Sequence, residues 1–200
     1  WWGNKIDDTE AIRMLKRAYD LGINFYETSD VYGKGKSEKL LAQAFGGMKK
    51  GEIIYSTKWG YDIYDAEQVG HNELPQKHSP DFLQFALQQS MKRLQVDYLD
   101  VYSLHNPKMS AIQDDKLFLS LDALVKGGKI RSHGVALGPA IGWEQEGLEA
   151  MQKRNITCLQ TVYNILEQDP GRSFLDSARE NNVGLLVRVP DASGVLTGKV

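Results

Sequence analysis

The sequence has little of what marks several classes of protein. A single cysteine among 200 residues leaves the chain unable to form an internal disulfide bond. It has no run of about 18 apolar residues, so we expect no transmembrane helix. A formal net charge of -2 gives no electrostatic basis for binding nucleic acid or an anionic membrane surface. These absences predict a protein of the reducing cytoplasm whose partner is neither nucleic acid nor a membrane.

Neither the cysteine nor most of the histidines indicates a reactive or metal-binding site. Cys158 stands in an apolar, strand-like run, which predicts a buried structural thiol. His71, His78 and His133 lack partners at the spacing of metal ligands, so no metal site is predicted. The fourth histidine, His105, belongs to a different group of residues, described below.

Apolar, β-branched segments recur along the chain, most of them at intervals of about 30 residues, the length of one strand plus one crossover helix. The predicted strands lie near residues 23–28, 53–58, 99–105, 130–137, 157–163 and 184–190. Helical patterns lie between them, near residues 9–21, from Ser79-Pro80 onward, and near 117–124, 143–154 and 173–181. Alternating units of this kind predict parallel strands covered by helices.

Two architectures fit this alternation, an open doubly wound sheet and a closed eight-stranded barrel. No Gly-x-Gly-x-x-Gly motif follows a predicted strand, so the nucleotide fingerprint of the doubly wound sheet is absent and a dehydrogenase of that type is the weaker alternative. Polar residues at the ends of many strands favour a barrel mouth. We therefore predict an α/β protein, a (β/α)8 TIM barrel with about six of its eight strand–helix units present. Residues 1–200 would be a single, incomplete barrel domain that lacks the first and last strands.

Three residues able to exchange protons stand at the ends of successive predicted strands. Tyr32 follows the first strand, Lys58 ends the second and His105 ends the third. In a parallel α/β fold, catalytic groups gather at the C-terminal ends of the strands. The spacing therefore predicts one enzyme site, and the long polar segment 61–78 after the second strand predicts a wall of its substrate pocket.

Six short motifs also follow one another along the chain. They are Gly22-Ile23-Asn24-Phe25 leading to Asp30-Val31-Tyr32-Gly33 with Ser37-Glu38, Ser56-Thr57-Lys58-Trp59-Gly60, Asp97-Tyr98-Leu99-Asp100, Leu104-His105-Asn106-Pro107, Gly128-Lys129-Ile130-Arg131, and Ser193-Gly194-Val195-Leu196-Thr197-Gly198-Lys199. In this order they resemble the aldo-keto reductase family of nicotinamide-dependent barrel enzymes, over nearly the whole chain. The resemblance is greatest to the branch that contains potassium-channel β subunits and bacterial stress-type reductases.

The resemblance implies a catalytic set of four residues. Tyr32 would be the general acid, with a pKa lowered by the nearby ammonium of Lys58. His105 would donate a hydrogen bond to the substrate carbonyl and orient it. The family's aspartate lies five positions before its tyrosine, where this chain has Glu27. Glu27 rather than Asp30 is therefore expected to hold Lys58 charged and in place.

The resemblance also implies contacts with a cofactor. Gln160 would hold the nicotinamide carboxamide, and the guanidinium plane of Arg188 would stack on the nicotinamide ring. The chain departs from the family at Ala136-Leu137, where a Ser-Asn pair is common, and at Asp191, a negative charge near the phosphates. Further cofactor contacts would come from Pro190, Ser193, Gly194, Leu196 and Lys199.

These expectations together describe an NADP-dependent aldo-keto reductase that reduces small aldehydes or ketones to alcohols. NADPH is the preferred cofactor and NADH the other candidate. The alternative is a regulatory or accessory subunit that binds a nicotinamide cofactor but turns over little substrate. The sequence specifies neither the substrate nor the oligomeric state.

Overall fold

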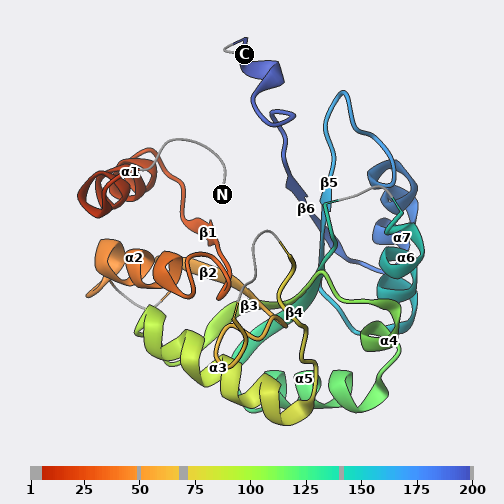
Figure 1. Ribbon diagram of the computed structural model, residues 1–200. Coiled ribbons are helices and arrows are strands. Elements are labelled where there is room, and N and C mark those ends of the chain that lie inside the picture. Colours follow the sequence, from red (N-terminus) through yellow and green to blue (C-terminus); the bar gives the residue numbers. More distant parts are fainter. Residues whose placement is uncertain (1–5, 49–50, 68–71, 140–141, 199–200) are drawn as a thin grey trace.

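The computed structural model describes residues 6–48, 51–67, 72–139 and 142–198 of the chain. Within these residues six parallel strands form one sheet, in which each strand pairs with the next along the sequence. The strands are β1 (Phe25–Glu27), β2 (Ile54–Trp59), β3 (Leu99–His105), β4 (Ile130–Ala136), β5 (Cys158–Val162) and β6 (Gly184–Arg188). The sheet curves into part of a barrel, with the helices outside it and β1 and β6 at its two edges (Figure 1). All six predicted strands and their parallel order are confirmed.

The helices cover the outer face of the curved sheet (Figure 1). The predicted helices are confirmed with small shifts of their ends, whereas α2, α4 and two short 3-10 helices were not placed from the sequence. The α-helices are α1 (Asp8–Asp20), α2 (Lys36–Phe45), α3 (Pro80–Leu94), α4 (Met109–Ile112), α5 (Asp115–Lys126), α6 (Glu144–Lys153) and α7 (Phe174–Glu180). The 3-10 helices are η1 (Gly171–Ser173) and η2 (Val195–Thr197).

The main core lies between the sheet and these helices. α3 begins as predicted, because the Ser79 hydroxyl caps it by accepting the Phe82 N–H at 3.2 Å. α1 is different, since it packs against α2 and its apolar residues Ile12, Leu15 and Tyr19 are only partly buried. The leucines of α3 and α5 are buried, namely Leu83, Leu87, Leu94, Leu117, Leu121 and Leu124.

Two expectations drawn from composition can be compared with the structure. Cys158 is free and buried at the start of β5, and burial raises the pKa of its thiol to about 11. The thiol is therefore unreactive near neutral pH, as predicted. Among the described residues, no helix combines the length and the apolar character needed to span a membrane.

The register of the sheet aligns the C-terminal ends of its strands. His105 on β3, Ala136 on β4 and Gln160 on β5 stand level with one another. On the next pair of strands, Val162 stands level with Arg188. Side chains from distant parts of the sequence therefore meet at one end of the half-barrel.

A buried ion pair between Glu38 and Arg93 links α2 to α3. Glu38, which has no solvent exposure, accepts hydrogen bonds from Arg93 Nε at 2.5 Å and from the Thr57 hydroxyl at 2.7 Å. Gly35, just before α2, has a φ of +84°, and a Cβ there would lie 2.4 Å from Arg93 Cδ. Only glycine therefore lets Arg93 reach Glu38 beside this turn.

Breaking this pair should destabilise the protein. We expect Glu38→Gln to lower the free energy of unfolding by about 3 kcal/mol, because Arg93 would keep a partly buried charge without its partner. Urea denaturation checks this, with Glu10→Gln as the matched control, since Glu10 pairs with Arg13 on the surface. Equal midpoints for the two variants would contradict it.

Candidate active site

Lys58 and Glu27 form an ion pair at the ends of β2 and β1. The ammonium of Lys58 contacts the Glu27 carboxylate and donates a hydrogen bond to the Thr28 carbonyl at 2.7 Å. The Lys58 side chain is 2% exposed and that of Glu27 is 31% exposed. A buried ammonium is costly unless it is paired, and Glu27 supplies the pairing charge.

The electrostatics of Lys58 result from two opposed effects. Burial and the guanidinium of Arg188 lower the pKa of Lys58 to about 7. The carboxylate of Glu27 opposes this lowering, because an adjacent negative charge favours the ammonium form. Near neutral pH Lys58 therefore exchanges between ammonium and amine, and its contact with Glu27 favours the ammonium.

Tyr32 lies in the turn after β1, beside both other predicted groups. Lys58 Nζ is 4.8 Å from the centre of the Tyr32 ring, and the Tyr32 and His105 rings meet edge to face with centres 5.9 Å apart. Burial raises the pKa of the Tyr32 hydroxyl, and the charge of Arg188 opposes that rise. The prediction that Lys58 lowers the pKa of Tyr32 is therefore wrong, because burial has the larger effect. Tyr32 is therefore protonated at neutral pH, as a proton donor must be.

His105 is buried at the end of β3. Burial and the charges of Lys58 and Arg188 lower its pKa well below the usual range. The ring is therefore neutral at neutral pH, with one N–H and one acceptor nitrogen. Its Nδ1 lies 2.9 Å from the hydroxyl of Ser29, a buried residue in the loop after β1. Sequence reasoning did not single out Ser29, since the two residues are 76 positions apart.

Residues of the segment 61–78, which was predicted to form a wall of the pocket, are hydrogen-bonded to the end of β3. The Gln76 amide donates to the backbone carbonyls of His105 and Asn106, at 3.2 and 2.9 Å. Asn106 Nδ2 donates to the Tyr61 hydroxyl at 2.9 Å, and the Tyr61 ring lies 5.1 Å from that of His105. Tyr61 therefore borders the site. Trp59 is fully buried and packs in the core.

The predicted cofactor side of the site lies at the ends of β4, β5 and β6. Gln160 is 8% exposed on β5. Arg188, at the end of β6, is half-buried and donates to the Leu137 carbonyl at 3.2 Å. Ala136 and Leu137 are 0% and 1% exposed, so their side chains belong to the core.

The segment after β6 extends beyond the sheet (Figure 1). Val189 has a φ of +55°, unusual for a β-branched residue, and the chain turns there. The N–H groups of Gly194 and Leu196 donate to the Asp191 carbonyl, so they are used within the loop. Pro190, Ser193 and Leu196 are exposed and Gly194 is partly buried, whereas Lys199 lies outside the described residues. The described members of this predicted set of cofactor contacts thus lie on a separate segment from Tyr32, Lys58 and His105.

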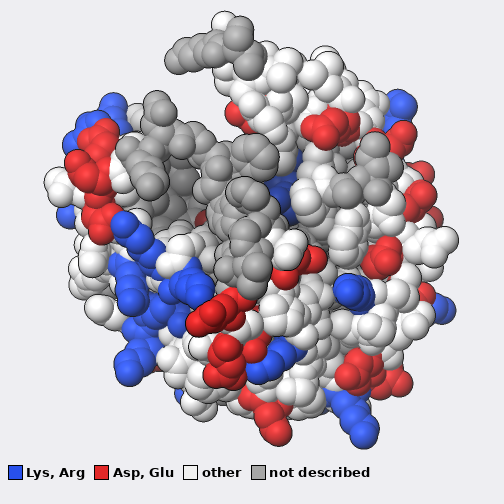
Figure 2. Space-filling model, viewed as in Figure 1, with Lys and Arg blue, Asp and Glu red and all other residues white. Residues whose placement is uncertain are grey.

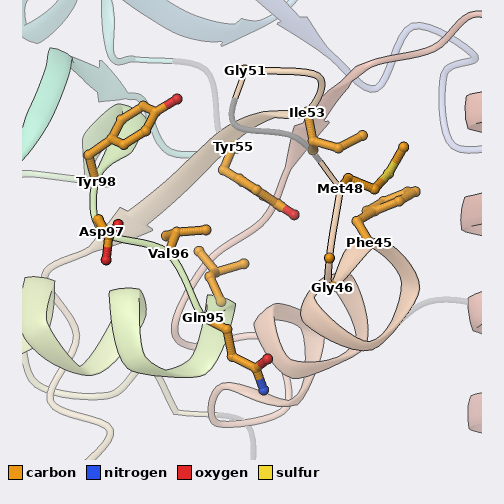
Figure 3. Close-up of a pocket in the computed structure, with 12 residues that line it drawn as sticks. Phe45, Gly46, Met48, Gly51, Ile53, Tyr55, Gln95, Val96, Asp97 and Tyr98 are labelled. Carbon is orange, nitrogen blue, oxygen red and sulfur yellow. The ribbon is translucent and has the colours of Figure 1, made fainter.

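Two other hollows are distinct from this cluster. A pocket of about 240 Å³ lies at the opposite, N-terminal ends of β2 and β3, lined by Phe45, Met48, Ile53, Tyr55 and Val96 among others (Figure 3). Lys and Arg side chains also gather over α2 and α3 (Figure 2), where a groove of about 480 Å³ includes Lys34, Lys39, Lys92 and Arg93. Because Glu38 already pairs with Arg93, this groove has no buried cation free for an anion.

His78 and His133 lie in structural surroundings. Burial lowers the pKa of His78 to about 4, and its ring packs on Trp59. His133 lies 2.9 Å from Asp122, whereas His71 lies outside the described residues. Across the residues that the structure describes, no three His, Cys, Asp or Glu side chains gather as metal ligands.

Comparisons with known proteins give one family. The profile of the Aldo/keto reductase family matches residues 1–200. An aldo-keto reductase from Bacillus halodurans in its holo form superposes with a TM-score of 0.83 at 29% identity, covering 96% of this chain and 61% of that one. The NADH-specific methylglyoxal reductase of Escherichia coli is 27% identical over 208 residues, covering 100% of this chain and 62% of its own length. The aldo-keto reductase yakc of Schizosaccharomyces pombe, named for NADP(+), is 30% identical over 190 residues, covering 92% and 53%.

The chain thus spans between 53% and 62% of the length of these relatives. Its curved six-stranded sheet corresponds to part of the (β/α)8 TIM barrel of such enzymes, as the sequence predicted. Because the family profile extends over every residue and the fold agrees with solved members, this chain belongs to the aldo/keto reductase family.

Proposed function

We propose that this chain contributes the catalytic centre of an NAD(P)H-dependent oxidoreductase that reduces small aldehydes or ketones to alcohols. The observation that supports this most is the convergence of Tyr32, His105 and the paired Lys58 at one end of the sheet. One tyrosine that is protonated at neutral pH, one neutral imidazole and one buried cation suit proton delivery to a carbonyl oxygen.

The residues beside this cluster suit a nicotinamide cofactor. Arg188 affects the pKa of Tyr32, Lys58 and His105, so its positive charge acts on all three. Gln160 adds an amide at the neighbouring strand end. A guanidinium plane for stacking and an amide for a carboxamide match the nicotinamide ring in chemistry. When bound, such a cofactor supplies the hydride.

The protein's own residues would supply the proton and the electrostatic stabilisation. Tyr32 Oη gives its proton to the carbonyl oxygen, which would otherwise develop the full charge of an alkoxide. His105 donates a hydrogen bond to the same oxygen and orients the carbonyl. The positive charges of Lys58 and Arg188 stabilise the tyrosinate that remains, until a proton from water restores the hydroxyl. Glu27 acts on Lys58 by keeping it charged and in place.

Two further properties of the protein are proposed. Residues 1–200 belong to one barrel domain, because pairing runs unbroken from β1 to β6. The cytoplasm is the proposed compartment, because the one cysteine is unpaired and the net charge is close to neutral.

Removing the Tyr32 hydroxyl tests the catalytic assignment. We expect Tyr32→Phe in the intact protein to reduce the turnover of a simple aldehyde by roughly 10²–10⁴-fold, the usual value of general acid catalysis. Cofactor binding should be retained, and Lys58→Met should be comparably severe. Tyr98→Phe is the matched control, since the Tyr98 hydroxyl accepts from Arg131 at the other end of the sheet. Near wild-type reduction by Tyr32→Phe would exclude the mechanism.

Removing the Glu27 charge tests the role of the ion pair. Without the carboxylate the pKa of Lys58 should fall. On the alkaline side of the pH–rate profile, the activity of Glu27→Gln should therefore decline at a lower pH than that of the wild type. The sign follows because the ammonium, present below its pKa, is the form that stabilises tyrosinate. The pH dependence of kcat measures the shift, with Asp8→Asn as the control that breaks the exposed pair with Lys36. An unmoved alkaline limb in Glu27→Gln would refute this role.

Cofactor choice and the role of Arg188 are tested together by fluorescence titration. The two curated relatives are named for different cofactors, NADH for one and NADP(+) for the other, and we propose NADPH here. Arg188→Met should weaken NADPH binding about tenfold, the size of a partly desolvated stacking contact. Arg131→Met is the control, since Arg131 lies over the Tyr98 ring at the other end of the sheet. Tighter binding of NADH by the wild type would reverse the proposed preference.

One observation favours the accessory subunit as a second candidate. Ala136 and Leu137 are fully buried and apolar, so this strand end offers the cofactor only backbone groups. The same experiments separate the two functions. Cofactor binding with turnover that Tyr32→Phe abolishes supports the enzyme, whereas binding without measurable turnover in the wild type supports the accessory subunit.

A further inference from the structure

Ser29 lies where three acceptors compete for one proton. Its hydroxyl oxygen is 2.9 Å from His105 Nδ1, 3.3 Å from Asp30 Oδ1 and 3.3 Å from the backbone carbonyl of Lys58. Ser29 is fully buried, away from bulk solvent. A hydroxyl donates a single proton, and its choice of acceptor determines what its neighbours must do.

Asp30 is a carboxyl group that the proposed mechanism does not use. It is fully buried, and its Oδ2 has no hydrogen-bond partner among the described residues. Burial and the negative charge of Glu38 raise the pKa of Asp30 to about 8, against opposing effects from Arg93, the Ser29 hydroxyl and the Val31 N–H. Around neutral pH the carboxyl is therefore mostly protonated and can donate a hydrogen bond.

The two protonation states of Asp30 favour opposite hydrogen-bond directions. When neutral, Asp30 donates to Ser29 Oγ, and the Ser29 hydroxyl donates to His105 Nδ1, which at 2.9 Å is nearer than the Lys58 carbonyl at 3.3 Å. The ring proton is then on Nε2. When ionised, Asp30 accepts a hydrogen bond from the Ser29 hydroxyl. His105 Nδ1–H then donates a hydrogen bond to Ser29 Oγ, and Nε2, without a proton, becomes an acceptor. The first state contains three exchangeable protons and the second contains two. The difference is the one proton released to solvent.

We propose that Asp30 and Ser29 form a relay that sets which nitrogen of His105 is protonated. In the neutral state His105 presents an N–H at Nε2, the donor that a substrate carbonyl requires. In the ionised state that donor is lost. The relevance to catalysis rests on the role proposed for His105, but the tautomer is a property of the chain alone. Asp30 and Ser29 are thus positioning residues that act through His105.

Other charged or titratable groups also face Asp30 and His105, and their titration must be distinguished from that of Asp30. Asp30 interacts electrostatically with four other groups, Glu38, Arg93, Tyr64 and Tyr102. Burial raises the pKa of the two tyrosines, so both stay neutral near neutral pH. The groups that face His105 are Lys58, Arg188, Tyr32 and Tyr61. Lys58, with a pKa of about 7, is the group whose titration most resembles that of Asp30.

The test is nitrogen NMR of the intact protein labelled with 15N-histidine, recorded from pH 6 to pH 9.5. His105→Gln assigns the His105 signals by their loss. In the wild type we expect the Nε2–H tautomer at low pH and the Nδ1–H tautomer at high pH, with a midpoint near pH 8. Asp30→Asn should hold the Nε2–H tautomer throughout, because its amide donates to Ser29 as a neutral carboxyl does. Ser29→Ala should remove the transition by breaking the link.

The controls separate the relay from other causes. Ser132→Ala should keep the wild-type transition, because the Ser132 hydroxyl donates instead to the Asp100 carbonyl at 3.0 Å. A transition that persists in Asp30→Asn would come from Lys58 and would overturn the proposal. One unchanging tautomer in the wild type would also overturn it. None of these measurements uses substrate, so the relay can fail while the proposed reductase activity stands, and the reverse.

Discussion

The buried ammonium of Lys58 is the constraint on which the site depends. A cation removed from water must meet an anion or lose its proton, and the interaction is strong because little water screens it. Glu27 meets it from the neighbouring strand, and the Thr28 carbonyl accepts one of its protons at 2.7 Å. The parallel register of β1 and β2, with Glu27 beside Ser56, brings that carboxylate within reach. The longer side chain of glutamate therefore suffices where the family has aspartate.

Most of the fold could be predicted because its signals are local. Strand spacing, the apolar stripes of α3 and α5, and the Ser79-Pro80 start of α3 all lie within short windows of sequence. α2 was not placed, because it follows a left-handed glycine, Gly35, and lacks a side-chain cap. Its key residue is Glu38, whose partner Arg93 lies 55 positions away. Such pairs depend on the tertiary fold, which no local pattern encodes.

The site shows the same division between local and distant signals. The strand-end positions of Tyr32, Lys58 and His105 could be predicted because the ends of parallel strands gather at one edge. The resemblance to a family pointed to Glu27. Neither approach identified Ser29 or the burial of Asp30, because serine and aspartate after a strand usually indicate a solvated turn. Their roles follow from the covering that α2, α3 and the loop 61–78 provide.

Two carboxyl groups at the end of one strand thus differ in charge because their surroundings differ. Glu27 is partly exposed and touches a cation, so ionisation is favoured there. Asp30, three residues on, is fully buried near Glu38, so the proton is retained. The Glu38–Arg93 pair that fastens the helices therefore also acts on the site, since Glu38 raises the pKa of Asp30 while Arg93 lowers it. Separated protonation states of this kind place a carboxylate and a neutral carboxyl three residues apart at the same pH.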